Sequence, residues 1–301
     1  MRTRRVPSIH PCMIPQSRVK SDRLVLTLSK SRGKSMSPAV RAMFHVSRAS
    51  AAGLLLCAAG AASALDTAEE IRACSNANFP ESTSLQLIEL KSLDRAGSER
   101  VMDARLHWKR HDDGHVRLMI RILGPQDLKG SAYLVIENKP RDSVYLYAPA
   151  LGRPRRIVGG GGKGIWGTDF SYEDIRLLQM SSTATPAERL PDSEVAGRAT
   201  YVISQAPDAD RESVYVKTVS YVDKETCVSL QTEYYEVEDQ PRKRLLVDPA
   251  TVKQVGGKWT AHDLEITDLS EDTRSWIQVK DISVDENISA RFFNTVQFYK
   301  N

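Results

Sequence analysis

The 301-residue sequence predicts a mainly β fold in which one antiparallel sheet curls around its own interior. Three observations support this fold class. From residue 85 onward, about ten segments with strand-like apolar patterns are separated by turn residues, as in an antiparallel meander. Two segments have the pattern of helices. Strands and helices do not alternate regularly along the chain, which argues against a parallel α/β sheet.

The first 64 residues are expected to be targeting material rather than part of the fold. A charged start at Met43, a short apolar stretch over 49–61 and the ending Ala62-Ser63-Ala64 are the three parts of a secretory signal peptide. The apolar stretch is shorter than the ~20 residues that span a bilayer. We therefore predict a signal peptide over 43–64 that is cleaved after Ala64.

Two alternatives concern this N-terminal region. Residues 1–42 are rich in Arg, Lys and Ser, and they either precede a true start at Met43 or form a long basic beginning of the signal. A lipoprotein signal that ends at Cys57 is the other alternative. Such signals require a small residue before the cysteine, whereas this chain has Leu56.

The net positive charge of the chain lies in this N-terminal region. The sequence holds 42 Lys and Arg against 38 Asp and Glu, and 11 of the basic residues but one acidic residue fall within 1–64. Residues 65–301 therefore carry a net charge of −6. This acidic balance removes the main support for a nucleic-acid partner. We expect 65–301 to form a single domain and a monomer.

The predicted domain opens with a helix and a strand. Asp66 is the expected N-cap of a helix that continues to Cys74, with acidic residues in its first turn. The strand over 85–90 is apolar on much of both faces, and a turn follows at 95–98.

A hairpin is expected next. The segment 99–110 leads to Asp112-Asp113-Gly114, and Asp-Gly supplies the positive φ that a tight turn requires. The returning strand places apolar residues on one face, namely Val116, Leu118, Ile120 and Ile122. Its other face carries mostly polar residues, so we expect it to be largely exposed to solvent.

The middle of the chain combines covered strands with a second helix. Strands over 131–137 and 143–147 are apolar or aromatic on both faces, which is typical of strands covered on both sides. A glycine run over 159–164 is expected to be flexible. Ser171 is the predicted cap of a helix that extends to residue 179, and Asp174 lies where a capping box places its acidic partner.

The remaining residues continue the meander. The expected strands cover 199–205, 214–222, 227–236, 244–247, 258–269 and 275–284. Cys74 and Cys227 are the cysteines of the predicted domain, and an oxidising compartment would permit a disulfide between them. The alternative is that both are small buried hydrophobic residues.

Sequence motifs for catalysis or metal binding are weak. Gly162-Lys163 is followed by Gly164 instead of the Ser or Thr of a phosphate-binding loop. The segment from His111 to His115 is centred on the predicted hairpin turn, which would place both histidines in solvent. His107 and His262 do not lie at metal-ligand spacing from a cysteine. Asp169, Glu173 and Asp174 are best explained by a cap and a solvated helix face. We predict no enzymatic activity, no cofactor and no metal.

The stretch 144–157, which reads VYLYAPALGRPRRI, and the stretch 167–174, which reads GTDFSYED, resemble the outer-membrane lipoprotein-sorting family. They are similar to the LolA-like branch and its W-x-Y-x-P-x-x-x-x-x-R-R-I and G-S-D-F-x-Y-E-D signature. Segments 128–130 and 221–223 also fall in the expected order. Tyr145 replaces the family's Trp and Thr168 replaces its Ser, and both changes are mild.

This resemblance implies an incomplete, half-open β-barrel whose concave face is apolar and is covered by lid helices. It also implies a carrier for lipid acyl chains or lipoproteins that works in the periplasm beside an inner-membrane exporter of the resistance-nodulation-division type. The alternative function is an accessory subunit that docks on such an exporter without carrying cargo.

The resemblance suggests candidate site residues. Ligand-binding candidates on the concave face are Val116, Leu118, Ile120, Ile122, Tyr133, Val135, Tyr145 and Tyr147. The alternative is that these side chains pack against the lid as ordinary core. Trp166 and Phe170 are candidates for a lid or hinge. Arg153, Arg155 and Arg156 are candidates for contact with a lipid headgroup or a partner. The alternative is that they form a solvated basic loop that binds nothing.

Overall fold

A computed structural model describes residues 65–158, 164–179 and 185–300. The predicted signal peptide over 43–64 with its cleavage after Ala64 lies outside these described residues. So does most of the glycine run, over 159–163.

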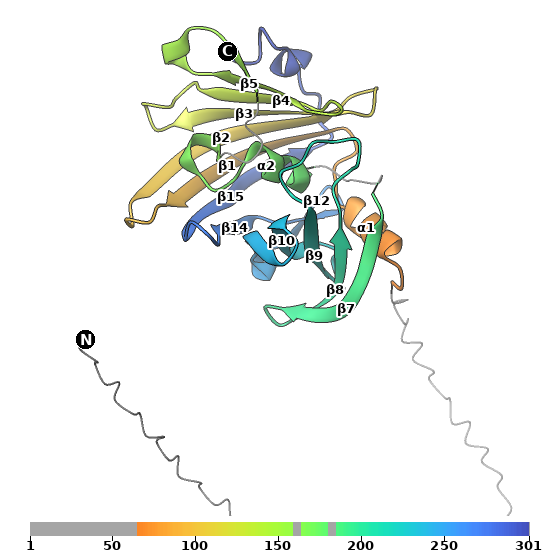
Figure 1. Cartoon of the computed structure of the whole chain (residues 1–301). Helices are drawn as coiled ribbons and strands as arrows, with labels where there is room; N and C mark the ends of the chain where they lie inside the picture. The colour runs from red at the N-terminus through yellow and green to blue at the C-terminus, as the bar shows by residue number, and fades with distance from the viewer. Residues whose placement is uncertain (1–64, 159–163, 180–184, 301) are drawn as a thin grey trace, which may run out of the picture. The chain divides into compact units, whose positions relative to one another are not determined.

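The described chain forms one thirteen-stranded antiparallel sheet (Figure 1). Its order from edge to edge is β6-β5-β4-β3-β2-β1-β15-β14-β11-β10-β9-β8-β7. The strands are β1 Thr83–Leu93, β2 Glu99–Arg110, β3 Val116–Gly124, β4 Ala132–Ile136, β5 Ser143–Tyr147, β6 Arg155–Ile157, β7 Ala187–Val195, β8 Arg198–Gln205, β9 Lys217–Asp223, β10 Ser229–Val237, β11 Gln240–Val247, β14 Asp263–Asp268 and β15 Thr273–Val284. A separate hairpin joins β12 Lys253–Val255 to β13 Lys258–Thr260.

Six short helical segments accompany the sheet in the described part of the chain. Two are α-helices, α1 Ala68–Asn76 and α2 Tyr172–Gln179. The other four are single 3₁₀ turns, η1 Pro149–Leu151, η2 Ile165–Gly167, η3 Pro249–Thr251 and η4 Ala290–Phe293. No helix in these segments is long and apolar enough to cross a membrane.

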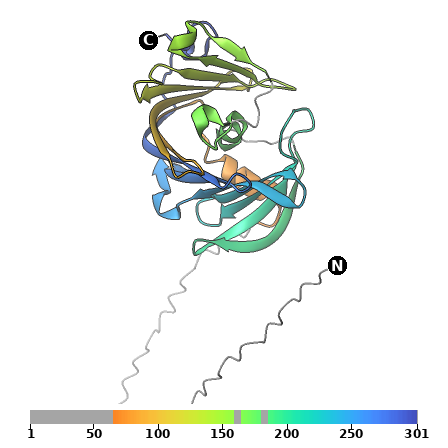
Figure 2. The same ribbon diagram turned by 60° about the vertical axis from the view of Figure 1, so that its left-hand side comes forward.

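The sheet is strongly curved but does not close, because its edge strands β6 and β7 do not pair with each other. Helix α2 lies inside the curve (Figure 2). The expectation of an incomplete, half-open barrel with helices on its inner side is therefore confirmed. The first and last strands of the domain, β1 and β15, are neighbours near the middle of the sheet.

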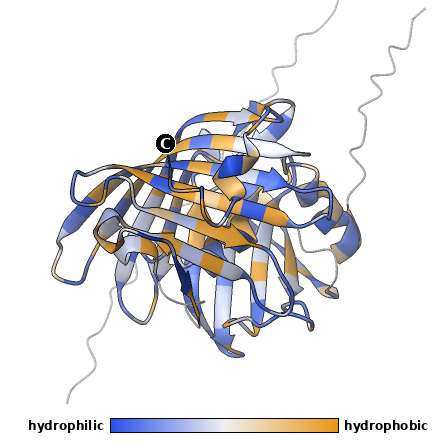
Figure 3. Cartoon of the chain, turned by 90° about the horizontal axis from the view of Figure 1, so that it is seen from above, coloured by the Kyte–Doolittle hydropathy of each residue, from blue (hydrophilic) through white to orange (hydrophobic). Residues whose placement is uncertain are grey.

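Local sequence explains the β2–β3 hairpin and its register. Gly114 adopts a positive φ of 79° in the connecting turn, as the Asp-Gly pair predicts. Along the strands, hydrophobic and hydrophilic residues alternate (Figure 3). Leu106 lies opposite Ile120 and Trp108 opposite Leu118, so one row of β2 and one row of β3 share the concave face.

The convex face of β2–β5 is covered, whereas the sequence predicts that the outward face of β3 is largely exposed to solvent. The C-terminal segment after β15 packs its aromatic side chains onto the backs of β2–β5. Met119 is consequently fully buried, His107 stacks on Phe292 with ring centroids 4.3 Å apart, and Arg121 donates hydrogen bonds to carbonyl groups of the segment. The C-terminal segment and the convex face together form a hydrophobic cluster. Its buried members are Met119, Ala132, Leu134, Ile288, Phe293 and Phe298.

The strands β6, β7, β12 and β13 are not expected from sequence as separate elements. The edge strand β7 has the sequence AERLPDSEV, whose charged residues and proline hide the alternating pattern. An edge position tolerates the proline because one side of the strand needs no ladder donors. The predicted strand over 258–269 is divided between β13 and β14.

Both predicted helices are present, with one correction to their caps. The N-cap of α1 is Thr67 rather than Asp66, because Thr67 and Glu70 form the reciprocal capping box. The cap of α2 is the predicted one. Its Ser171 backbone nitrogen donates to Asp174 over 2.8 Å, and the Asp174 nitrogen donates to the Ser171 hydroxyl over 3.1 Å.

Helix α1 is tied to the sheet near its inner surface. Ala68 and Ile71 pack against Tyr201 and Ile203 of β8 in a small buried cluster. A disulfide joins Cys74 of α1 to Cys227 before β10, with Cα atoms 5.6 Å apart across a sequence separation of 153 residues. The helix is thereby fixed at one end of the hollow side of the sheet.

Candidate functional site

The concave side of the sheet contains a cavity of about 730 Å³. Its walls come from β1, β2, β8–β11, β14 and β15, and α1 and α2 contribute side chains from the open side. Much of the lining is aliphatic, including Ile88, Leu106, Val116, Leu177, Leu178, Leu245, Ile277 and Val279. A hollow of this size and composition is typical of a site for a small apolar ligand.

One wall of the cavity is less apolar than the rest. The inward positions of β9 and β10 include Thr218, Ser220 and Thr232, and these positions lie side by side in the sheet. On β1, Gln86 faces the cavity and donates a hydrogen bond to Ser84 over 3.2 Å. The cavity therefore offers an apolar surface with hydroxyl and amide groups on part of its boundary.

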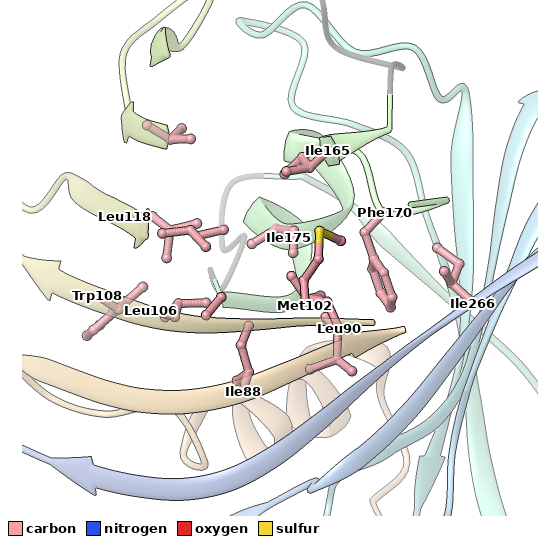
Figure 4. Close-up of a cluster of buried hydrophobic side chains, with 14 of the residues drawn as sticks. Ile88, Leu90, Met102, Leu106, Trp108, Leu118, Ile165, Phe170, Ile175 and Ile266 are labelled. Carbon is pink, nitrogen blue, oxygen red and sulfur yellow. The ribbon is translucent and has the colours of Figure 1, made fainter. Parts of the chain in front are cut away.

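The opposite end of the concave face is filled rather than hollow. Leu118, Ile120 and Ile122 are at most 4% exposed and belong to a packed cluster with Ile165 and Phe170. Figure 4 shows Ile165, Phe170 and Ile175 pointing toward the side chains of β1, β2 and β3. Among the predicted lining residues of β3, Val116 reaches the cavity. The other three form packed core beneath residues 164–179, which are called the covering segment below.

The four remaining lining candidates divide between the two faces. Tyr133 and Val135 share the concave face with Leu118, and Tyr133 packs edge-on against Trp166 with ring centroids 4.6 Å apart. Tyr145 and Tyr147 lie on the convex face, where Tyr147 stacks on Tyr299 at 4.1 Å. Their predicted placement on the concave face is corrected, because the register of β5 sets Leu146 opposite Tyr133.

The covering segment over 164–179 is built by tight backbone contacts. Ile165 donates its backbone N–H to the Phe170 carbonyl over 2.7 Å, and Trp166 has a positive φ of 49°. A Cβ atom on Gly164 would lie 1.8 Å from the Thr168 carbonyl oxygen, so a side chain does not fit there. Trp166 is partly buried and Phe170 is fully buried, so both are packed against the sheet.

Helix α2 is attached to the sheet by a buried polar cluster. The Asp174 carboxylate accepts hydrogen bonds from Lys243 Nζ of β11 over 2.8 Å and from the Tyr215 hydroxyl. Asp174 is fully buried and Lys243 is 4% exposed. Burial raises the pKa of Tyr215, and the neighbouring Asp174 raises it further, so the hydroxyl stays a donor.

Asp169 and Glu173, the two other carboxylates of the stretch 167–174, also attach the covering segment to the rest of the domain. Asp169 accepts from Ser275 Oγ over 2.6 Å and from Thr273, both on β15. Glu173 is 3% exposed and accepts from Ser213 Oγ over 2.6 Å. Burial raises the pKa of Glu173 above its ordinary value. The predicted capping role of Asp174 is therefore confirmed, whereas the prediction of a solvated helix face is wrong for Glu173.

The sheet has two wings, one ending at the edge strand β6 and the other at the edge strand β7. Ion pairs connect these wings across the open side of the sheet. The loop between β8 and β9 meets the turn between β4 and β5, where Lys139 lies 2.9 Å from Asp208. Arg211 lies 3.0 Å from Asp142, and Arg176 of α2 reaches the same carboxylate at 3.2 Å. Because the side chains of Arg176, Arg211 and Asp142 are at most 12% exposed, this network holds α2 and both wings together.

Sequence reasoning does not identify Lys243 or Arg211 as site residues. Each lies in a segment with several other charged residues, where a single cation has the same local pattern whether it is exposed or buried. Their carboxylate partners are 69 residues away along the chain. No local signal identifies such a pair.

The arginines of the predicted basic cluster and the histidines at the β2–β3 turn do not come together at one site. Arg153, Arg155 and Arg156 are exposed on the loop around β6, and none of them lines the cavity. His111 packs edge-on against Phe293 on the convex side, whereas His115 lines the cavity. Within the described segments, no three His, Cys, Asp or Glu side chains form a group that could hold a metal ion.

Comparison with solved structures assigns the fold. A DUF1329 family protein from Desulfovibrio piger superposes with a TM-score of 0.69 at 22% identity, covering 75% of this chain and 95% of that chain. A putative outer membrane lipoprotein-sorting protein domain from Vibrio parahaemolyticus gives 0.68 at 23% identity, covering 77% and 98%. A LolA superfamily protein from Nitrosomonas europaea gives 0.61 at 15% identity, covering 76% and 98%.

Sequence comparison gives a family without a described activity. No curated protein matches the chain in sequence. A family model described as "Uncharacterized protein" matches residues 114–299, which is more than half of the chain. The chain belongs to the family of that model, and its fold is the LolA-like fold of outer-membrane lipoprotein-sorting proteins.

Proposed function

We propose that this protein is a non-enzymatic carrier that holds the hydrocarbon part of a lipid or lipoprotein in its cavity and works in the periplasm. The observation that carries the proposal is the hollow of about 730 Å³, which has an extensive aliphatic surface. Transfer of an acyl chain from water into such a hollow gains ~0.8 kcal/mol for each buried CH₂ group. A chain that buries ten such groups therefore gains about 8 kcal/mol before the cost of ordering it.

Two further observations support this proposal. The fold is shared with a protein described as a putative outer membrane lipoprotein-sorting protein domain. An acyl chain that crosses an aqueous compartment is stabilised by an apolar surface that shields it from water. The N-terminal sequence predicts export through a cleaved signal peptide.

The exposed arginines around β6 favour the accessory-subunit alternative, because an exposed basic loop is available to a membrane partner.

A direct test compares ligand binding in two variants that add the same bulk. Ser220→Trp inserts an indole into the cavity from β9, whereas Ser193→Trp places it on the exposed edge strand β7. Displacement of a fluorescent fatty-acid probe should be strongly weakened in Ser220→Trp and unchanged in Ser193→Trp. Mass spectrometry of an organic extract of the purified protein should also detect bound lipid.

The outcomes separate the two candidate functions. If the wild-type protein neither binds the probe nor yields lipid on extraction, the carrier proposal fails. Co-purification of such an empty protein with an inner-membrane exporter would then support the accessory-subunit alternative. Equal binding by the two tryptophan variants would show that the ligand occupies a site other than this cavity.

A further inference from the structure

The cavity lining carries more positive than negative charge, although residues 65–301 have a net charge of −6. Three acidic side chains line it, Asp113, Glu137 and Asp208. The seven cationic side chains of the lining are Arg72, Arg110, Lys139, Arg176, Arg211, Lys217 and Lys258.

Most of these cations are already paired. Lys139, Arg176, Arg211, Lys217 and Lys258 each lie within 4.0 Å of at least one carboxylate oxygen. Arg72 donates to the Thr185 backbone carbonyl. Arg110 has no carboxylate or carbonyl partner for its guanidinium group among the residues that the structure describes, and its guanidinium carbon lies 5.4 Å from the centroid of the Trp108 ring.

Arg110 occupies a defined place on the concave face. It is the last residue of β2, and the alternation of that strand puts it in the same row as Leu106 and Trp108. Its own backbone N–H is bonded to the Ser82 carbonyl over 2.8 Å, so its position at the strand end is fixed. The side chain is half-buried and lines the cavity.

The neighbouring strand becomes polar toward the same end. The inward row of β1 runs from Ile88 through Gln86 to Ser84, and Ser84 lies opposite Trp108. Gln86 and Ser84 are both buried, at 8% and 0% exposure. Two adjacent strands therefore change from aliphatic to polar along one direction and end beside an unpaired arginine.

We propose that the cargo is an anionic amphiphile whose headgroup, a carboxylate or a phosphate, is bound by Arg110. Its hydrocarbon chain extends from Arg110 along the inward rows of β1 and β2, past Leu106 and Ile88. A guanidinium group can donate two parallel hydrogen bonds to either anion. This inference rests on the proposed carrier function, and it specifies the chemical class of the same cargo.

The test uses three probes with the same acyl chain and different headgroups. Palmitate carries a carboxylate, palmitoyl-lysophosphatidic acid carries a phosphate, and 1-palmitoylglycerol is neutral. At mildly alkaline pH and low salt, the wild-type protein should bind at least one anionic probe about tenfold more tightly than the neutral one, which corresponds to about 1.4 kcal/mol. The anion that shows the larger preference identifies the source of the headgroup.

Variants at Arg110 locate the preference. Arg110→Gln should lose it while still binding 1-palmitoylglycerol, and Arg110→Lys should keep part of it because the charge remains. Arg100→Gln is the matched control, since Arg100 pairs with Asp127 and does not line the cavity. Near-ultraviolet circular dichroism of each variant checks that the fold is retained.

The outcomes distinguish this inference from the carrier function. Equal affinity of the wild-type protein for neutral and anionic probes, or an unchanged preference in Arg110→Gln, overturns the headgroup site and leaves the carrier function intact. If none of the probes binds, the carrier function itself fails. If Arg110→Gln does not fold, the salt dependence of the wild-type preference decides, because a preference that high salt does not reduce would contradict a charge-based site.

Discussion

Lys243 of β11 and Asp174 of α2 form an ion pair of 2.8 Å in which both side chains are buried. The pair joins the covering helix to the sheet from the inside of the curve. Ser171 and Tyr215 donate to the same carboxylate, so both of its oxygens are bonded within the protein. Helix α2 is therefore a fixed part of the cavity wall.

Removing one partner of this pair should be costly. Asp174→Ala leaves the Lys243 ammonium group buried without a counter-ion, and we expect the free energy of unfolding to fall by about 3–5 kcal/mol. Urea unfolding followed by circular dichroism measures the loss. The double variant Asp174→Leu with Lys243→Met should recover part of it, because no unpaired charge remains although Ser171 and Tyr215 lose their acceptor. A loss below that of the exposed Arg100–Asp127 pair, ~1 kcal/mol or less, would contradict the assignment.

The filled end of the concave face should respond to truncation as a core does. Leu118→Ala removes a side chain that is 4% exposed and packs under the covering segment, so we expect a loss of about 2–5 kcal/mol in unfolding free energy. Thr218→Ala, at the cavity wall, should change stability by less than about 1 kcal/mol because it leaves no new void in packed core. Chemical denaturation of both variants compares them. Equal losses would show that the two ends of the concave face are packed alike.

The disulfide between Cys74 and Cys227 should stabilise the domain substantially. It closes a loop across a sequence separation of 153 residues, and a cross-link of this length contributes about 2–5 kcal/mol. Cys74→Ser with Cys227→Ser should therefore lower the melting temperature by several degrees. Calorimetry with and without a thiol reductant measures the effect, and the double variant should not respond to the reductant. If reduction leaves the wild-type melting temperature unchanged, the bond contributes no stability.

His107 should make stability depend on pH in the mildly acidic range. Burial, together with the nearby charges of Arg105 and Arg121, lowers its pKa from the ordinary value of 6.5 to about 4. Below pH 6.5 the unfolded chain takes up a proton that the folded chain does not, so stability falls as pH decreases toward 4. The loss between pH 7.5 and 5 should be about 2 kcal/mol.

The contribution of His107 can be isolated by substitution. His107→Phe keeps an aromatic ring against Phe292 and removes the titrating group. Urea unfolding at both pH values should show a pH-dependent loss that is smaller in the variant than in the wild-type protein. Equal losses in the two proteins would mean that other groups cause the effect.

The elements that the sequence predicts well are those determined by neighbours along the chain. The Asp113-Gly114 turn fixes the β2–β3 hairpin, and the Ser171–Asp174 capping box fixes the start of α2. The alternation along β3 also places Leu118 on the correct face. Each of these features depends on interactions within a few residues.

The errors arise where both faces of a strand are apolar. In β5, Tyr145 and Leu146 are both suited to burial, so alternation cannot show which residue faces the concave side. The choice is made by the register with β4 and by the aromatic C-terminal segment that covers the other face. The location of the cavity is equally non-local, because its walls come mainly from strands whose inward residues mix Thr and Ser with aliphatic side chains.

The open seam of the sheet is closed by loops instead of by strand pairing. Since β6 and β7 do not share a ladder, spreading the two wings would leave every hydrogen bond between strands intact. It would break the backbone hydrogen bond from Glu212 to Pro140 and the buried ion pairs of Asp142 with Arg211 and Arg176, which cost more to break than exposed pairs do. These loop contacts therefore act as a latch that keeps the width of the cavity constant, so we expect the protein to select cargo by girth.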